Sequence, residues 1–162
     1  MIKKNNSNDN QIVRIVSYDE EGLSEIELLW EKLNKYLGKC STYFSDAMRK
    51  KTFHGRYNEI IKNNALVKVY VAYCNEAKVG YCISKIDNIS GEIESLYVDT
   101  PYRGKGIGSM LVKRSLEWFD NLKIDKISVT VSIGNEKVIS FYNQFDFYER
   151  NIVLQRKNHL ET

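Results

Sequence analysis

The chain has 162 residues, of which 43% are hydrophobic and 28% are charged, and this balance is typical of one folded domain. Its 24 basic and 21 acidic residues give a net charge of +3, which is too small to indicate a nucleic-acid partner. The sequence contains no apolar run of membrane-spanning length and no secretory signal. We therefore expect a cytoplasmic protein without a membrane partner, with a disordered leader at residues 1–10 and a single domain over residues 11–162.

The cysteines and histidines give no pattern of a disulfide scaffold or a metal site. Cys40, Cys74 and Cys82 are odd in number and lack CxxC spacing. His54 and His159 lie far apart and have no ligand-like neighbours. We expect reduced thiols and no bound metal.

The first half of the chain predicts three strands and two helices. In chain order these are a strand at residues 12–16, helices at about 24–36 and 41–63, and strands at 66–73 and 79–86. The second helix has the weaker pattern, with an expected interruption near Gly55. The two later strands are joined by a polar turn, and a second turn leads to the next strand, so an antiparallel meander is expected.

The second half opens on a strand with two distinct faces. Over residues 92–98 a period of two places Glu92, Glu94, Leu96 and Val98 on one face. The remaining predicted elements, in chain order, are a helix at 107–122, a strand at 127–131, a helix begun by Asn135 and a terminal hairpin at 147–149 and 152–156. The strand at 127–131 should lie parallel to the strand at 92–98, because a helix connects them.

A glycine-rich turn, Arg103-Gly104-Lys105-Gly106-Ile107-Gly108, joins that strand to the helix. Its glycines allow positive φ and a close approach of the backbone to a ligand. The unpaired N–H groups at the start of the helix favour an anion, so a phosphate or pyrophosphate is the expected ligand. A P-loop is excluded because Lys105 is followed by Gly106, and the spacing differs from a dinucleotide fingerprint. A turn without a ligand remains an alternative.

Residues 98–108 resemble motif A of the GNAT superfamily of acyl-CoA-dependent N-acetyltransferases. The core of that motif, Arg/Gln-x-x-Gly-x-Gly/Ala, is matched by Arg103, Gly106 and Gly108. Downstream, the aromatic and amide positions of motif B are matched by Asn135, Phe141, Tyr142, Phe145 and Phe147. One departure is Asp146, which stands where the family usually has glycine. The resemblance implies the GNAT fold, an α/β fold with a mixed (α+β) sheet. The sheet is mostly antiparallel and flanked by helices, and two of its parallel strands splay apart.

The resemblance also implies acetyl-CoA as the cosubstrate. Its pantetheine would lie between the splayed strands, along the main chain of Leu96 and Val98, and its pyrophosphate at the glycine-rich turn. The implied cofactor-binding residues are Leu96, Val98, Arg103, Gly104, Lys105, Gly106, Ile107, Gly108, Ser109 and Asn135. On the residues alone, Leu96 and Val98 are equally core strand positions and Asn135 is equally a plain helix cap.

The implied reaction is attack of an amine on a thioester. An alkylammonium with a pKa near ~10 must first lose a proton, which a carboxylate can accept. Glu94 stands where several family members place this base, and Glu92 is the second candidate. Glu94 is equally an exposed strand residue or an acceptor-binding charge. Tyr142 occupies the family's general-acid position, with an aromatic core residue as the alternative.

The absence of a G-x-S-x-G motif favours direct transfer in a ternary complex over an acyl-enzyme. We therefore expect an N-acetyltransferase that acts on a primary amine of a small molecule or a peptide, with a homodimer possible by family analogy. Two alternatives stay open. One is a non-catalytic domain that binds acyl-CoA or a protein partner, and the other is a nucleotide-phosphate binder.

Overall fold

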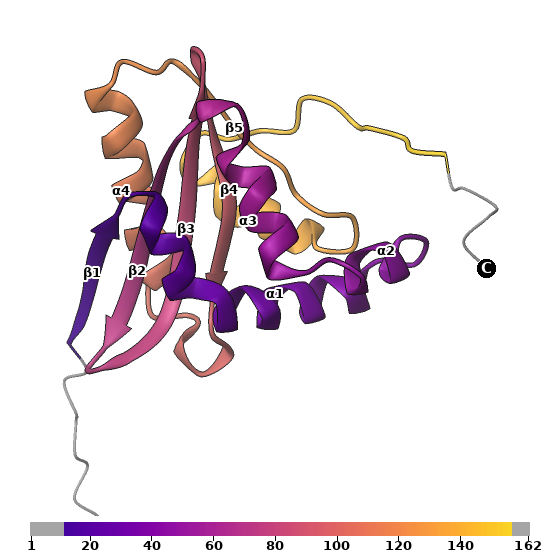
Figure 1. Ribbon diagram of the computed structural model, residues 1–162, viewed down its shortest axis with the longest axis horizontal. Helices are drawn as coiled ribbons and strands as arrows, with labels where there is room; N and C mark the ends of the chain where they lie inside the picture. The colour runs from indigo at the N-terminus through magenta and orange to yellow at the C-terminus, as the bar shows by residue number, and fades with distance from the viewer. Residues whose placement is uncertain (1–11, 157–162) are drawn as a thin grey trace, which may run out of the picture.

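The computed structural model describes residues 12–156, so the predicted leader lies outside the described part of the chain. One five-stranded sheet has the order β1-β2-β3-β4-β5 (Figure 1). Its strands are β1 Val13–Tyr18, β2 Leu66–Cys74, β3 Ala77–Asp87, β4 Ser90–Val98 and β5 Lys126–Val129. The first four are antiparallel neighbours and β5 runs parallel to β4, which confirms the predicted mixed sheet.

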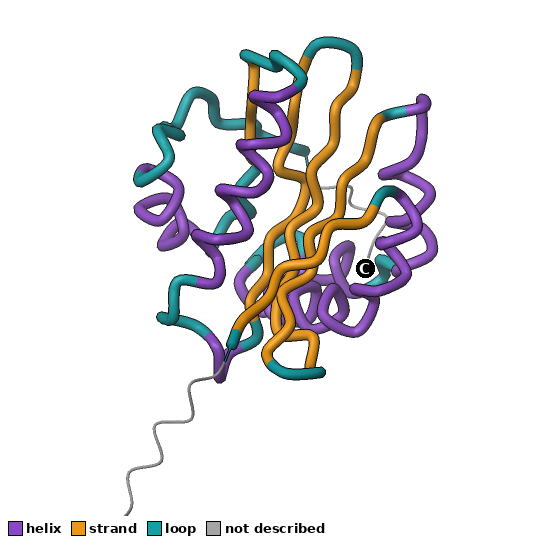
Figure 2. The backbone as a smooth tube through the Cα atoms, turned by 90° about the vertical axis from the view of Figure 1, so that its left-hand side faces the viewer, coloured by secondary structure: helices purple, strands orange, loops and turns teal. Residues whose placement is uncertain are grey.

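Helices cover both faces of the sheet, as Figure 2 shows with the sheet seen edge-on. They are α1 Glu27–Cys40, α2 Ser45–Arg49 and α3 Phe53–Ile61 on one side, and α4 Ile107–Asn121 and α5 Ile139–Asn143 on the other. The predicted helix at 107–122 is confirmed as α4. Among residues 12–156, no helix is long and apolar enough to cross a membrane. The same residues gather no cluster of three or more potential metal ligands from His, Cys, Asp or Glu.

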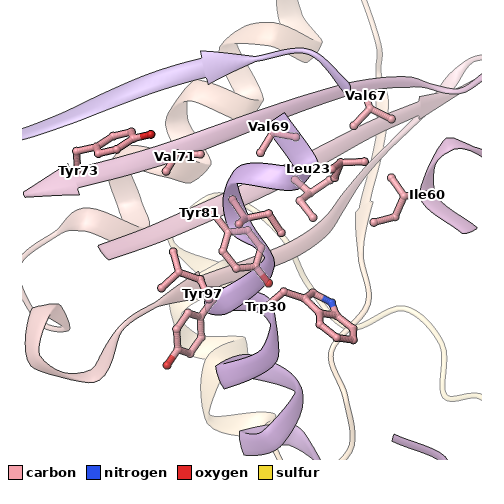
Figure 3. Close-up of a cluster of buried hydrophobic side chains, with 12 residues drawn as sticks. Leu23, Trp30, Ile60, Val67, Val69, Val71, Tyr73, Tyr81 and Tyr97 are labelled. Carbon is pink, nitrogen blue, oxygen red and sulfur yellow. The ribbon is translucent and has the colours of Figure 1, made fainter. Parts of the chain in front are cut away.

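The sheet separates two hydrophobic cores. The core under α1 and α3 contains Leu23, Trp30 and Ile60 above valines and tyrosines of β2, β3 and β4 (Figure 3). Tyr81 is fully buried at its centre, and its hydroxyl lies 2.9 Å from the Ser95 hydroxyl. The second core packs α4 and α5 on the opposite face. Because each large apolar side chain buried here contributes about 1.5–3 kcal/mol, both helical layers are held firmly against the strands.

A β-bulge in β4 changes which residues face each core. The register of β3 and β4 slips between Ile93 and Ser95, so Glu94 has no partner residue on β3. An extra residue of this kind shifts the side chains that follow to the opposite face. Ile93 therefore packs under α4, whereas Tyr97 packs under α1. The strict alternation predicted over residues 92–98 is wrong: Glu94 points to the α3 side, and Leu96 and Val98 to the α4 side.

The two helices predicted in the first half of the chain differ from the structure. The helix at 24–36 begins as a 3-10 turn, η1 Glu20–Ile26, before α1. The helix at 41–63 is two helices, and the break falls at residues 50–52, where Thr52 caps α3 by accepting a hydrogen bond from Gly55 N–H. Gly55 is therefore inside α3 rather than at the interruption.

The predicted terminal hairpin is wrong. Residues 147–156 contain no strand, and Ile152, Val153 and Leu154 are 88–92% exposed. Strand-forming residues become a strand only when another strand pairs with them. Within the described residues no strand pairs with this segment, and the free edge of β5, which is only four residues long, carries no partner strand.

Candidate functional site

The site lies where the parallel strands β4 and β5 stop pairing. They pair only from Ser90 with Lys126 to Ile93 with Val129. β5 then ends, while β4 continues for five more residues to Val98. The sheet therefore opens beside the second half of β4.

The main chain of Leu96 and Val98 faces this opening. Asp99 N–H donates to the carbonyl of Val79 on β3 at 2.8 Å. Because successive residues of a strand point their N–H and C=O groups to alternate sides, Val98 and Leu96 point theirs away from β3. An extended ligand in the opening can thus hydrogen-bond to the main chain of Leu96 and to the N–H of Val98 in the manner of an added strand, while the Val98 carbonyl accepts from Arg103.

The glycine-rich turn follows the end of β4. Gly104 and Gly106 have φ of +74° and +78°, a region that favours glycine. A Cβ placed on either residue would meet no atom within 4 Å, so the space beside the turn is open. Gly106 is the N-cap of α4 and makes no side-chain capping bond, which leaves the first N–H groups of the helix for an anion. This space and these donors fit a bulky diphosphate group.

Arg103 contacts β4 and α1. Its Nε donates to the carbonyl of Val98 at 2.8 Å. Its guanidinium lies 5.4 Å from the centre of the Tyr97 ring and 5.7 Å from that of Tyr36. Lys105 lies over the ring of Tyr102, with Nζ 5.5 Å from its centre.

A cavity of about 460 Å³ adjoins the opening. One wall comes from the helical layer, with Trp30, Asn34, Met48, Lys51 and Arg56. The other comes from β4, the end of β5 and the segment after it, with Glu92, Glu94, Ser95, Leu96, Thr130, Asn135 and Tyr142. The cavity therefore combines charged groups at the helical side with main chain and aromatic groups at the sheet.

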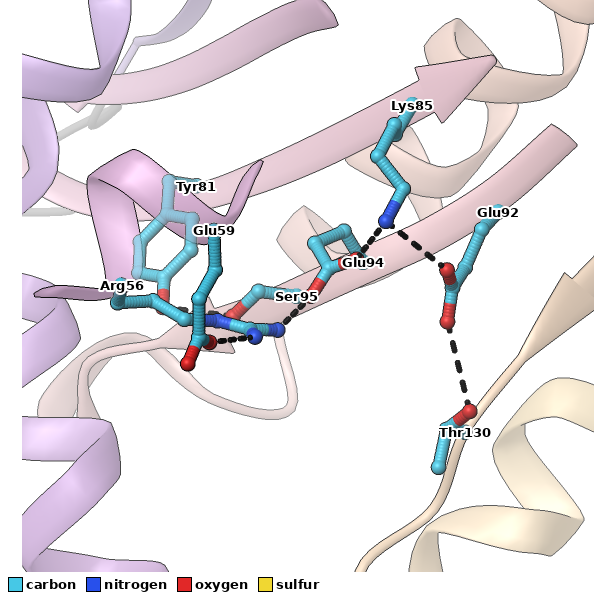
Figure 4. Close-up of polar contacts among 8 residues, drawn as sticks. All are labelled: Arg56, Glu59, Tyr81, Lys85, Glu92, Glu94, Ser95 and Thr130. Carbon is cyan, nitrogen blue, oxygen red and sulfur yellow. Dashed lines mark hydrogen bonds and ion pairs between the residues drawn. The ribbon is translucent and has the colours of Figure 1, made fainter. Parts of the chain in front are cut away.

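Glu94 is buried, with 6% of its side chain exposed, and is bound by two cations (Figure 4). Its Oε1 pairs with Nη2 of Arg56 from α3, and its Oε2 lies 2.9 Å from Nζ of Lys85. Glu92 is more exposed, and its carboxylate lies 3.4 Å from both the Lys85 ammonium and the hydroxyl of Thr130. A group that approaches this carboxylate therefore meets the Arg56 guanidinium and the Lys85 ammonium beside it.

Tyr142 lines the cavity from α5 and is 6% exposed. Burial raises the pKa of its phenol above the ordinary value, because desolvation disfavours the phenolate. The hydroxyl is therefore a proton donor at neutral pH. The ring packs edge-on against Phe141 and Phe147, with centroids 5.2 and 5.9 Å away, so the phenol is held in one place.

Asn135 occupies the N-cap position of a 3-10 turn, η4 Glu136–Val138, but its side chain makes no capping bond. Its Oδ1 instead accepts a hydrogen bond from the hydroxyl of Tyr36 at 3.3 Å, which ties the segment after β5 to α1. Asp146, at the position where glycine was expected, has φ of +61°. Aspartate tolerates this left-handed region better than most residues, which explains how it replaces a glycine there.

The structure brings part of the predicted site together. Glu92, Glu94, Leu96, Asn135 and Tyr142 share the cavity. The residues of the glycine-rich turn, Arg103 to Ser109, lie outside the cavity lining, where β4 leads into α4.

Sequence reasoning missed Arg56 and Lys85, which bind Glu94, and Tyr36, which binds Asn135. Arg56 stands three residues before Glu59 on α3. That spacing indicates only an ordinary surface ion pair.

The model of the acetyltransferase (GNAT) family matches residues 27–147. N-alpha-acetyltransferase 30 of Dictyostelium discoideum is 32% identical over 82 residues, which are 48% of this chain and 44% of that protein. The chain spans between 40% and 55% of the length of the curated relatives it matches.

Solved structures of acetyltransferases share the fold. An aminoglycoside N-acetyltransferase in complex with CoA is similar with a TM-score of 0.61 at 16% identity, over 91% of this chain and 95% of that chain. A predicted acetyltransferase of Clostridium acetobutylicum, solved with acetyl-CoA, has a TM-score of 0.64 at 18% identity, over 93% of this chain and 99% of that chain.

Proposed function

The chain belongs to the GNAT acetyltransferase family, and from that premise we propose that it transfers an acetyl group from acetyl-CoA to a primary amine by direct attack. The observation that carries this proposal is the opening between β4 and β5. There the main chain of Leu96 and Val98 faces a gap that leads toward the glycine-rich turn. The proposal places the pantetheine arm along β4 and the diphosphate at Gly104, Gly106 and the first N–H groups of α4.

Holding both substrates in one cavity supplies much of the acceleration, because attack becomes effectively intramolecular. In our proposal Tyr142 protonates or hydrogen-bonds the leaving thiolate, where negative charge develops. Its buried, neutral phenol supports that role. Glu94 accepts the proton of the acceptor ammonium, directly or through water, with Glu92 as the second candidate.

The acceptor would enter from the side of α1, α2 and α3, since the helical wall of the cavity faces Glu92 and Glu94 across it. The similar proteins include an aminoglycoside N-acetyltransferase and an N-alpha-acetyltransferase, so their acceptors differ. We propose a primary amine as the common chemistry of the acceptor, in a small molecule or at the end of a peptide.

The test measures release of the CoA thiol from acetyl-CoA across a panel of primary amines, with mass spectrometry of the acetylated product. The wild-type chain should turn over at least one amine, and Tyr142→Phe should slow it while CoA still binds. Binding of CoA without turnover on any amine would favour the non-catalytic alternative. Failure to bind CoA, together with a thermal shift caused by ATP, would favour a nucleotide-phosphate binder.

A further inference from the structure

The strongest unexplained feature is a row of alternating charges across the cavity. Glu59, Arg56, Glu94, Lys85 and Glu92 follow one another from α3 to β4 (Figure 4). The row joins the exposed surface of α3 to the most buried carboxylate of the cavity. None of these five residues belongs to either hydrophobic core.

Arg56 is shared between two carboxylates of different exposure. Its Nη1 lies 2.8 Å from Glu59, three residues later on α3, and its Nη2 pairs with Glu94. The Glu59 side chain is 60% exposed and that of Glu94 is 6% exposed. Arg56 can therefore leave Glu94 and remain paired on its own helix, so the contact with Glu94 is exchangeable.

Resting on the proposed function, we propose that Arg56 is an acceptor-specificity residue. Its guanidinium pairs with Glu94 in the absence of the acceptor, and the ammonium group of the acceptor displaces it from that carboxylate. A ligand that displaces Arg56 must replace its charge, because Glu94 is buried and loses a partner otherwise. An ammonium group does so, whereas a neutral or anionic group does not. The exchange also frees Glu94 from the guanidinium at the moment when a proton has to be removed from the acceptor.

The remaining charges favour the same class of acceptor. The row contains three carboxylates and two cations. Lys51, which also lines the cavity, and Lys62 act on Glu59, at the exposed end of the row, and not on Glu94. Lys85 stays paired with Glu94 and Glu92 after the exchange. A cationic acceptor then preserves the balance of charges around Glu94. An acceptor that also carries a carboxylate can instead pair that group with Arg56, which then stays where it is.

The substitution Arg56→Gln removes the competing cation but keeps a polar side chain of similar length. We expect the affinity for a cationic amine to rise about tenfold, because binding no longer breaks a charged hydrogen bond. In Glu59→Gln the displaced guanidinium has no partner on α3, so affinity should fall about twofold, as for loss of an exposed helix pair. Arg49→Gln is the matched control, since Arg49 pairs with Asp46 three residues before it on α2.

The experiment titrates 1,4-diaminobutane and 4-aminobutanoate into the CoA-bound protein by calorimetry, and measures KM and kcat for each with acetyl-CoA. The proposal expects a lower dissociation constant and KM for the diamine in Arg56→Gln, with an unchanged value in Arg49→Gln and an unchanged KM for acetyl-CoA. Weaker binding of 4-aminobutanoate in Arg56→Gln would instead make Arg56 an anion-binding residue and overturn the proposal. Equal binding of the diamine by wild type and Arg56→Gln, or binding by neither, would overturn it as well.

The two proposals fail separately. If the diamine binds more tightly to Arg56→Gln but neither protein releases thiol with any amine, the acetyltransferase function fails and the role of Arg56 in binding stands. If the wild type acetylates the diamine and KM does not change in Arg56→Gln, the specificity role fails and the function stands.

Discussion

Replacement of Gly106 by valine separates cofactor binding from folding. Gly106 has φ of +78°, and a Cβ on it would meet no protein atom within 4 Å. The new side chain therefore costs only the left-handed backbone conformation, about 2 kcal/mol for a branched residue. For a chain of this size that corresponds to a decrease in Tm of roughly 4–8 °C, and the protein should remain folded.

The effect on CoA should be larger. In the proposed complex, valine would fill the open space that the diphosphate enters, and about two charge-assisted hydrogen bonds to N–H groups would be lost or lengthened. At about 1.5 kcal/mol each, their loss lowers CoA affinity roughly 100-fold. Calorimetric titration of CoA measures this change, and circular dichroism on heating gives the Tm.

Asn88→Val is the matched control. Asn88 has φ of +56° in the turn between β3 and β4, at the opposite end of β4 from the glycine-rich turn. It should lose a similar amount of stability and keep wild-type CoA affinity. A folded Gly106→Val protein that binds CoA within about threefold of wild type would remove the glycine-rich turn from the binding site.

The remaining predictions concern the chemistry and the pH dependence of stability. Tyr142→Phe should keep Tm and CoA affinity and lower kcat by roughly one to three orders of magnitude; unchanged turnover, where chemistry limits the rate, would leave this ring as packing only. Glu94→Gln should lower kcat by roughly 10² to 10⁴ with little change in acetyl-CoA binding, whereas the same loss in Glu92→Gln alone would move the base to that residue. The hydrogen bond from the Lys32 ammonium lowers the pKa of Asp99 below its ordinary value. The charged Asp99 therefore stabilises the fold above about pH 4, and this stabilisation is lost as pH falls through the pKa of Asp99 in the folded protein. Urea unfolding of Asp99→Asn should therefore give a lower stability than wild type at pH 7 and should converge with it in acid; a constant difference would contradict this.

Much of the fold could be predicted because its signals are local. Helix α4 follows from an apolar stripe, and the parallel arrangement of β4 and β5 follows from the helix that connects them. The bulge at Glu94 could not be predicted, because it depends on the register against β3 rather than on the sequence of β4. The terminal hairpin failed for a related reason: residues 152–156 have strand-forming side chains but no strand beside them.

The spacing of motifs in the sequence predicted which residues line the candidate site, but it did not predict which side chains bind to them. The glycines of the turn were identifiable because Gly104 and Gly106 need a positive φ. The state of Glu94 was not, since Arg56 is 38 residues away in sequence and reaches the carboxylate only through the packing of α3 on the sheet. Ion pairs of this kind are tertiary, and a charge pattern along one helix cannot reveal them.

Helix α1 connects the two sides of the opening between β4 and β5. Lys32 Nζ lies 2.5 Å from Asp99 Oδ2 at the end of β4, and the hydroxyl of Tyr36 donates to Asn135 after β5. At its C-terminus α1 lies so close to Gly134 that a Cβ there would overlap the carbonyl oxygen of Cys40. Because one helix contacts both edges of the gap and also lines the cavity, the width of the gap and the shape of the cavity depend on the same element. If the acceptor and CoA bind as proposed, a shift of α1 would therefore act on both substrates at once, and it would strain the contacts of Lys32 and Tyr36.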